Sequence, residues 1–439
     1  MTKKIVNSSF KELSKNLNIL LTFMKEFLSP NKREMLIYII LMGAALCISF
    51  FKNMIFGYSL DPSGMGYYSI VITVSSYGVL LQLGLMNGLN RELPVALGQG
   101  KKERNLNLVG ESTSSVLLIQ TFFLIIYFIV ISLISFDDGT KESAFFLAGL
   151  AVIPSQLLSM VMLRLRAEQR TMAFAILHLL TTITTVAVSF VAIQYFGFKG
   201  AIWVLITVNL LAFIIVTIRY LPAANYLYFN SKDISYLLRI GFPAMLSSLV
   251  FALFFSIDKL FIMRFLSIED LGLYQIAFLP MVLGASIHSM VFQFLGPKLL
   301  FKFGAGSSLY SLYKEALKVS VSIMLLMAFL GPLIIFIIES VIEVWLPLYS
   351  EALPLISIFY VASIFMAANL SDIISTASNK PLIIFCQNSV LILIACSLFL
   401  FISIKPIIWY AYAVLILQLL KLSSSLIINF LIVKNMKSK

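Results

Sequence analysis

The chain has 439 residues, of which 60% are hydrophobic and only 12% are charged. A soluble protein of this length carries about twice that share of charged residues, so the composition excludes a soluble globular enzyme and predicts a multi-pass membrane protein. The net charge of +12 does not indicate nucleic-acid binding, because the basic residues lie in short segments between apolar runs, where they set the orientation of membrane proteins.

Residues 1–34 form a basic, partly amphipathic arm. We expect it to lie on the cytoplasmic membrane surface, where anionic lipids attract lysine and arginine. The arm lacks the apolar core and the small-residue cleavage site of a signal peptide. We therefore predict insertion into the bacterial inner membrane without a cleaved signal.

Apolar runs that are long enough to cross a bilayer as helices follow the arm. We predict twelve spans, at 36–58, 68–90, 113–135, 144–163, 172–195, 198–218, 241–265, 273–296, 317–338, 353–373, 382–403 and 407–432. With the N-terminus inside, 25 of the 32 basic residues lie in inside segments and four lie in outside loops. This bias alternates from loop to loop, so both termini are expected in the cytoplasm.

The two halves of the chain are related by an offset of 206 residues. Residues 65–70 (MGYYSI) align with 271–276 (LGLYQI), and 98–100 (GQG) align with 304–306 (GAG) in the same register. Each half holds six spans, an even number, so the halves share one orientation and form parallel repeats about an axis along the membrane normal.

The predicted fold is therefore an all-α polytopic membrane protein with two parallel six-helix lobes around a central cavity. Its segments are the arm 1–34, the N-lobe 35–220, a cytoplasmic linker 221–240, the C-lobe 241–433 and a basic cytoplasmic tail 434–439.

Two adjacent charged residues, Asp258 and Lys259, lie well inside the apolar run 241–265. A charge at the centre of a membrane helix costs about 2.5–3.5 kcal/mol on insertion scales, so such residues rarely face lipid. Two interpretations stay open. Either Lys259 extends to the membrane surface and Asp258 neutralises it, or the pair lines a water-filled cavity and binds a charged substrate or a coupling ion.

Three further cations lie within spans or at their ends. Lys52 aligns with Asp258, so a two-fold axis places them on opposite walls of the cavity; extension of Lys52 to the outer head groups is the alternative. Arg91 lies at the inner mouth, where a guanidinium can bind phosphate in a bidentate manner, although a loop charge that only sets orientation is the alternative. Lys421 is buried in the last span and leaves the same choice as Lys52.

The sequence contains no Walker loop, no His-Glu-x-x-His and no Gly-x-Ser-x-Gly. The cysteines Cys47, Cys386 and Cys396 have no metal-ligand spacing. We therefore predict a transporter without a cofactor rather than an enzyme, driven by an ion gradient or by substrate gradients.

Three segments resemble the polysaccharide transporter family, the O-antigen and capsule repeat-unit flippases of the multidrug/oligosaccharidyl-lipid/polysaccharide exporter superfamily. They are 256–277 (SIDKLFIMRFLSIEDLGLYQIA), its weaker first-half counterpart 61–70 (DPSGMGYYSI) and the inner turn 90–103 (NRELPVALGQGKKE). The resemblance implies two six-helix lobes around a cavity that is often cationic. It also implies alternating-access transport of an oligosaccharide repeat unit on undecaprenyl pyrophosphate.

Under this resemblance, Lys52, Arg91, Lys259 and Lys421 are the cations available to the pyrophosphate, and Asp258 orients Lys259 or binds a coupling proton or sodium ion. A polysaccharide polymerase and a chain-length regulator are the implied protein partners. A multidrug antiporter of the same superfamily is the first alternative, although it usually has carboxylates inside its lobes. A lipid II flippase typically has two further spans, and a membrane polysaccharide polymerase typically has a large basic outside loop.

Overall fold

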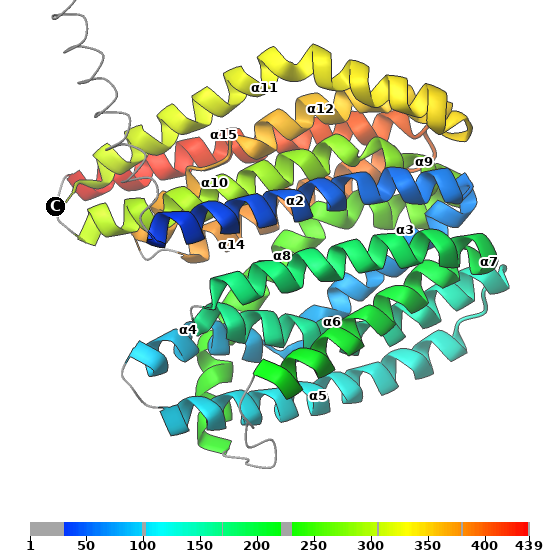
Figure 1. The fold of residues 1–439 in the computed structure, drawn as a ribbon. Helices are drawn as coiled ribbons and strands as arrows, with labels where there is room; N and C mark the ends of the chain where they lie inside the picture. Colours follow the sequence, from blue (N-terminus) through cyan, green and yellow to red (C-terminus); the bar gives the residue numbers. More distant parts are fainter. Residues whose placement is uncertain are drawn as a thin grey trace, which may run out of the picture.

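The computed structural model describes residues 30–98, 102–168, 170–220, 231–304, 307–378 and 381–437. Every regular element in these ranges is a helix (Figure 1). Nine helices of the described residues are long and apolar enough to cross a membrane. A tenth span results if α9 (Ile268–Ala277) and α10 (Leu279–Gly304), which are bent by 46° relative to each other, count as one. The predicted all-helical polytopic class is confirmed.

The remaining elements follow one another with short connections. In chain order they are α2 (Pro30–Ser59), α3 (Pro62–Gly78), η1 (Val79–Gln82), α4 (Leu85–Gly98), α5 (Lys102–Leu133), α6 (Gly139–Ala167), α7 (Thr171–Tyr220), α8 (Ser231–Phe265), α11 (Leu309–Trp345), η2 (Pro347–Ala352), α12 (Leu353–Ala367), α13 (Asp372–Ala377), α14 (Pro381–Phe401) and α15 (Ile408–Lys437). Figure 1 shows α11, α12 and α15 together on one side of the molecule and α5, α6 and α7 on the other.

Helix α7 contains the fifth and sixth predicted spans. Its backbone leaves the helical region at Gly197, with φ 57° and ψ −147°, a conformation that favours glycine. A Cβ atom on Gly200 would lie only 2.4 Å from the backbone oxygen of Ala192, whereas eight residues of a continuous helix span about 12 Å. The chain therefore folds back at Gly197, and the two arms of α7 pack against each other.

The second predicted span is broken between α3 and α4. Leu83 and Gly84 both have positive φ, at 54° and 89°, and the short helix η1 precedes them. The backbone N–H of Met86 donates to the Oε1 atom of Gln82 at 2.5 Å, which satisfies a donor that the break leaves without a helical partner. Broken helices are tolerated at membrane depth where protein groups replace the lost hydrogen bonds in this way.

Helices α3 and α9 pack against each other with the two-fold relation that the repeat predicts. A Cβ atom on Gly66 would lie 2.1 Å from the backbone oxygen of Ile268, and a Cβ atom on Gly272 would lie 1.8 Å from that of Pro62. Pro62 and Ile268 are separated by the same 206 positions as the two glycines. The two contacts therefore exchange under the repeat, as contacts across a two-fold axis do.

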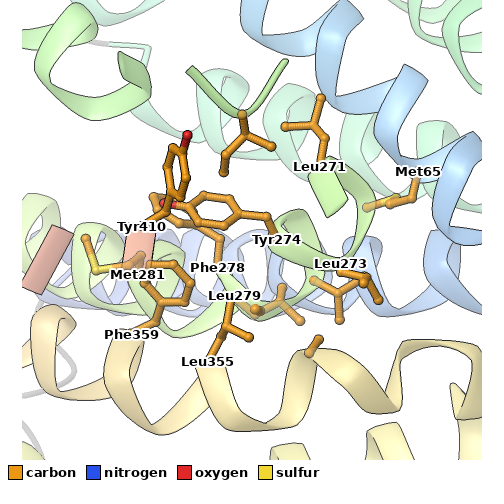
Figure 2. Close-up of a cluster of buried hydrophobic side chains, with 14 of the residues drawn as sticks. Met65, Leu271, Leu273, Tyr274, Phe278, Leu279, Met281, Leu355, Phe359 and Tyr410 are labelled. Carbon is orange, nitrogen blue, oxygen red and sulfur yellow. The ribbon is translucent and has the colours of Figure 1, made fainter. Parts of the chain in front are cut away.

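The largest buried cluster surrounds α9 and the start of α10 (Figure 2). The ring of Tyr274 lies edge-on to that of Phe359 at 5.1 Å, and Phe278 lies 5.4 Å from the same ring. Tyr410 of α15 is also fully buried in this cluster. Aromatic pairs of this kind add about 0.5–1.5 kcal/mol each beyond the burial of their area, so α9 is firmly attached to α12 and α15.

Helix α8 begins at Ser231 and takes in the second half of the predicted linker. Asp233 in its first turn complements the positive end of the helix dipole. Residues 221–230, the arm up to residue 29 and the tail residues 438–439 lie outside the described residues.

Asp138 starts α6 as its N-cap. Its carboxylate accepts hydrogen bonds from the backbone N–H groups of Thr140 at 2.8 Å and Lys141 at 3.3 Å, and from the hydroxyl of Tyr67. The Tyr67 hydrogen bond holds the pKa of Asp138 below its usual value. Asp138→Ala is expected to destabilise the protein by about 1 kcal/mol through the lost cap, which a lower Tm of the purified protein would reveal.

The pH dependence gives a control for this cap. Because the pKa of Asp138 is lowered in the folded state, its contribution is present near neutral pH and is lost as the pH falls through the folded-state pKa. Asparagine is a comparably good N-cap, so Asp138→Asn should have a higher Tm than Asp138→Ala at neutral pH. Equal Tm values for the two variants would contradict the capping role.

Candidate functional site

The charged pair of α8 is covered by a sharp turn of the chain. The hydroxyl of Ser267 accepts a hydrogen bond from the backbone N–H of Asp270 at 3.0 Å, and the backbone N–H of Ser267 donates to the Asp270 carboxylate at 3.2 Å. This reciprocal capping box fixes the start of α9. The turn brings Tyr274 and Gln275 beside the charged residues of α8.

Asp258 and Lys259 use different partners. The carboxylate of Asp258, which is 3% exposed, accepts hydrogen bonds from the hydroxyl of Tyr274 and from the backbone N–H of Lys259. The Nζ atom of Lys259 donates to Oε1 of Gln275 at 2.8 Å and lies 4.5 Å from the centroid of the Phe278 ring. Among the described residues, the two side chains form no ion pair within 4.0 Å. Lys259 therefore points to α9 rather than to the membrane surface.

Gln275 connects Lys259 to the other half of the chain. Its Oε1 atom also accepts a hydrogen bond from the hydroxyl of Ser69 on α3 at 3.1 Å. Ser69 and Gln275 are themselves equivalent positions of the repeat, 206 residues apart. One carbonyl oxygen thus joins a buried ammonium group of the second half to a hydroxyl of the first, at the interface between α3 and α9.

Lys52 occupies the first-half position that Asp258 occupies in the second half. Its Nζ atom lies 5.8 Å from the centroid of the Tyr68 ring and 5.9 Å from that of the Phe56 ring. Tyr68 aligns with Tyr274, so each half pairs a charged residue with the equivalent tyrosine, and the charge is positive in one half and negative in the other. Lys52 is half-buried, and in the described part of the chain it forms no ion pair with Asp258.

Arg91 lies on α4, and its side chain falls outside the described residues, so its contact with the cavity stays a prediction. The backbone around it is in tight contact with α8. A Cβ atom on Gly241 would lie 1.9 Å from the backbone oxygen of Gly84, and a Cβ atom on Gly88 would lie 2.4 Å from that of Leu237. The two halves of the chain therefore meet at α4 and α8 as well as at α3 and α9.

Lys421 lies within the second half of the chain. It is 6% exposed, and its Nζ atom lies 4.4 Å and 4.8 Å from the ring centroids of Phe251 and Phe254 on α8. A cavity of about 30 Å³ adjoins it. The polar side chains that line this cavity are His288, Asn369, Asp372, Gln418 and Lys421. A neighbouring cavity shares Gln418 and reaches Asp258, so the surroundings of Lys421 adjoin those of Asp258.

Sequence reasoning missed two parts of this site. Gln275 stands in the repeat motif opposite Ser69, but only the glycines and tyrosines of that motif carried the alignment. The phenylalanine rings around Lys421 belong to an apolar run that looks like any other membrane helix. A polar pair at equivalent positions of a repeat was the available signal for Gln275.

The comparisons with known proteins agree with this architecture. The profile of the family described as "Polysaccharide biosynthesis protein" matches residues 60–347, well over half of the chain. A search of curated protein sequences finds no significant match.

Solved structures of transporters share the fold along almost the whole chain. A lipid II flippase MurJ in an inward closed conformation aligns with a TM-score of 0.70 and 15% identity, over 91% of this chain and 90% of that one. A MATE family multidrug resistance transporter of the MOP superfamily in an inward-facing conformation gives 0.65 and 14%, over 91% and 95%. A MOP superfamily transporter from Pyrococcus furiosus, described as having a binding pocket of reverse polarity, gives 0.57 and 13%, over 91% and 95%.

Proposed function

Because this chain belongs to the polysaccharide biosynthesis protein family, we propose that it is a flippase for undecaprenyl-pyrophosphate-linked oligosaccharide repeat units. It moves them across the bacterial inner membrane by alternating access, for the synthesis of O-antigen, capsule or a similar surface polysaccharide. Both termini lie in the cytoplasm. The observation that carries the proposal is the hydrogen-bonded series Lys259–Gln275–Ser69, which joins a cation to both halves of a transporter fold.

A pyrophosphate group needs cationic partners when it leaves water. The Lys259 ammonium has one protein acceptor, Gln275 at 2.8 Å, and the phosphate oxygens compete with this acceptor for its protons. Binding of the anion would release Gln275 from Lys259 and leave only the bond to Ser69 across α3 and α9. Occupancy of the site thus weakens the contact between the halves that must separate for outward release.

The other predicted cations have graded roles. Arg91 at the inner mouth makes the first contact with the pyrophosphate, and Lys52 supplies positive charge from the first half. Lys421 adjoins the site through the second half and contributes least. The lipid tail stays in the bilayer while the head group crosses.

Asp258 is the proposed site for a coupling proton or sodium ion. Its carboxylate is buried and adjacent to the Lys259 ammonium, and it holds the hydroxyl of Tyr274. A change of charge at Asp258 therefore alters the field at the substrate cation one residue away. A polysaccharide polymerase and a chain-length regulator are the proposed partners that use the exported units.

A multidrug antiporter is the second candidate, and one observation favours it. Carboxylates of the second half, Asp258 and Asp372, line two adjoining cavities, as a site for cations requires. The three MATE-like and MurJ-like structures share only the fold with this chain, so they do not decide between the two functions.

The test of the proposed function is deletion of the gene followed by mass spectrometry of the membrane lipids. The flippase predicts accumulation of undecaprenyl pyrophosphate carrying a complete repeat unit on the cytoplasmic side, with loss of surface polysaccharide and recovery on complementation. Normal surface glycan with altered sensitivity to cationic drugs would indicate the antiporter. Single units that are exported but not polymerised would indicate a polymerase.

Arg91 provides a prediction about phosphate recognition at the inner mouth. Arg91→Ala is expected to lower surface polysaccharide about tenfold, because a charge-assisted hydrogen bond contributes about 1.5–3 kcal/mol. Arg91→Lys should recover only part of the loss, since lysine cannot bind phosphate in a bidentate manner. Arg219→Ala, at an exposed position near the same membrane face, is the matched control and should export normally. Full export by Arg91→Ala would exclude this role.

A further inference from the structure

A second buried carboxyl group lies far along the chain from the site described above. Glu111 on α5 is 0% exposed, and neither of its carboxyl oxygens has a hydrogen-bond partner among the described residues. The neighbouring hydroxyls of Ser112 and Ser115 are 0% and 4% exposed and are equally without partners. Glu111 and Ser115 are four positions apart and share one face of the helix. An unpaired carboxyl group of this kind is rare in a native protein.

The group lies in the contact between the two halves of the chain. Its helix packs on α4, α6 and α8, and leucines, valines and other apolar residues of these four helices form one cluster. The buried members of the cluster are Leu85, Met86, Leu89, Leu93, Leu108, Val109, Val116, Met160, Leu163, Ile234 and Leu237. The same helices α4 and α8 meet through Gly88 and Leu237. Separation of α8 from α4 would open this cluster and admit water to Glu111.

The charges around Glu111 do not favour its ionised form. Asp233 of α8 is the charged group whose field acts on it, with the same sign. On α6, Arg164 donates to Glu168 at 2.9 Å. On α4, Glu92 is half-buried and the side chain of Arg91 is outside the described residues. The remaining basic groups of α8 near this level, Lys232 and Arg239, are exposed.

An ionised carboxylate in such an environment costs several kcal/mol, and a like charge nearby adds to that cost. We propose that Glu111 is a proton-binding site that controls the contact between α4 and α8. The closed contact holds the protonated carboxyl group. When α8 moves away, the Oε–H bond gives its proton to cytoplasmic water and the carboxylate becomes hydrated; no other bond changes. Ser112 and Ser115 supply the hydroxyl groups along which water reaches the carboxyl group.

The bound ion is a proton rather than a metal cation. Hard cations require several oxygen ligands around them, whereas the residues one turn before and after Glu111, Leu108 and Val116, are apolar and buried. The inference gives the proposed flippase a source of coupling at its inner contact, and for that use it rests on the proposed function. The site itself depends only on the contact between α4 and α8.

The experiment is a distance measurement by electron paramagnetic resonance in lipid nanodiscs without cargo. Spin labels are attached at Asn90→Cys on α4 and Tyr236→Cys on α8, which are exposed positions, after the three native cysteines are replaced by serine. The short-distance, closed population should grow as the pH falls. In Glu111→Gln, a mimic of the protonated form, it should dominate at every pH, whereas Glu142→Gln, on exposed surface of α6, should titrate like the parent.

Asp233→Asn keeps the proposal testable if Glu111→Gln does not fold. Removal of the like charge favours the carboxylate, so the midpoint of the closing transition should move to lower pH. A Glu111→Gln variant that titrates like the parent would overturn the proposal. A closing transition that follows sodium concentration and not pH would also overturn it. Because no cargo is present, failure of the flippase proposal in the lipid analysis would leave this result unaffected.

Discussion

Lys259→Met is expected to reduce the export of surface polysaccharide by at least about tenfold. The substitution keeps the apolar stem and removes the ammonium group that donates to Gln275 at 2.8 Å. A hydrogen bond to a charged group contributes about 1.5–3 kcal/mol, and about 1.4 kcal/mol corresponds to a tenfold change in affinity. The loss should appear as accumulation of the lipid-linked repeat unit at a normal level of the protein.

Lys405→Met is the matched control, because Lys405 is exposed in a connection between helices and the same chemical change is made there. It should export normally. Lys259→Arg should export better than Lys259→Met, since it retains the charge, and Gln275→Leu should weaken the α3–α9 contact without removing the cation. Normal export by Lys259→Met would show that this cation does not bind the cargo.

Gly272→Ala is expected to have the second large effect. The added Cβ atom would lie 1.8 Å from the backbone oxygen of Pro62 and 3.1 Å from the backbone nitrogen of Gly66. Backbone atoms cannot rotate away as a flexible side chain can, so α3 and α9 must separate. Overpacking of this kind costs about 1–3 kcal/mol, and the separation also breaks the Ser69–Gln275 bond. We expect a lower Tm and a loss of export of at least about tenfold.

The repeat supplies both a confirming variant and a control. Gly66→Ala should behave like Gly272→Ala, because its Cβ atom would lie 2.1 Å from the backbone oxygen of Ile268. Gly43→Ala adds the same methyl group to a helix where no atom lies within 4 Å, and it should leave Tm and export unchanged or slightly higher. If all three variants behaved alike, the close α3–α9 contact would not be needed for function.

Much of the fold follows from hydropathy and repeat alone. The boundary between the fifth and sixth spans was predicted at 195–198, and the chain folds back at Gly197. The break between α3 and α4 was not predicted, because the run 68–90 is apolar throughout and the backbone bonds at Leu83 depend on the Gln82 side chain. Hydropathy measures the preference for lipid, not the continuity of a helix.

The site was predicted only in part. The positions of Asp258 and Lys259 followed from the cost of buried charge, and Asp258 is indeed buried. Their partners Tyr274 and Gln275 depend on the angle at which α9 returns after the Ser267 cap, which no local pattern specifies. Glu111 escaped notice because it stands at the end of a span, where a carboxylate usually meets water; its burial comes from α8, which is distant in sequence.

The most direct measurement of the central claim is transport by the purified protein in proteoliposomes. Lipid-linked oligosaccharide extracted from the deletion strain is placed in the membrane, and its exposure on each side is followed with a sugar-specific enzyme that cannot cross. The account predicts translocation by the intact protein and at least about a tenfold lower rate for Lys259→Met. Translocation no faster than in protein-free vesicles, at a verified level of folded protein, would contradict it.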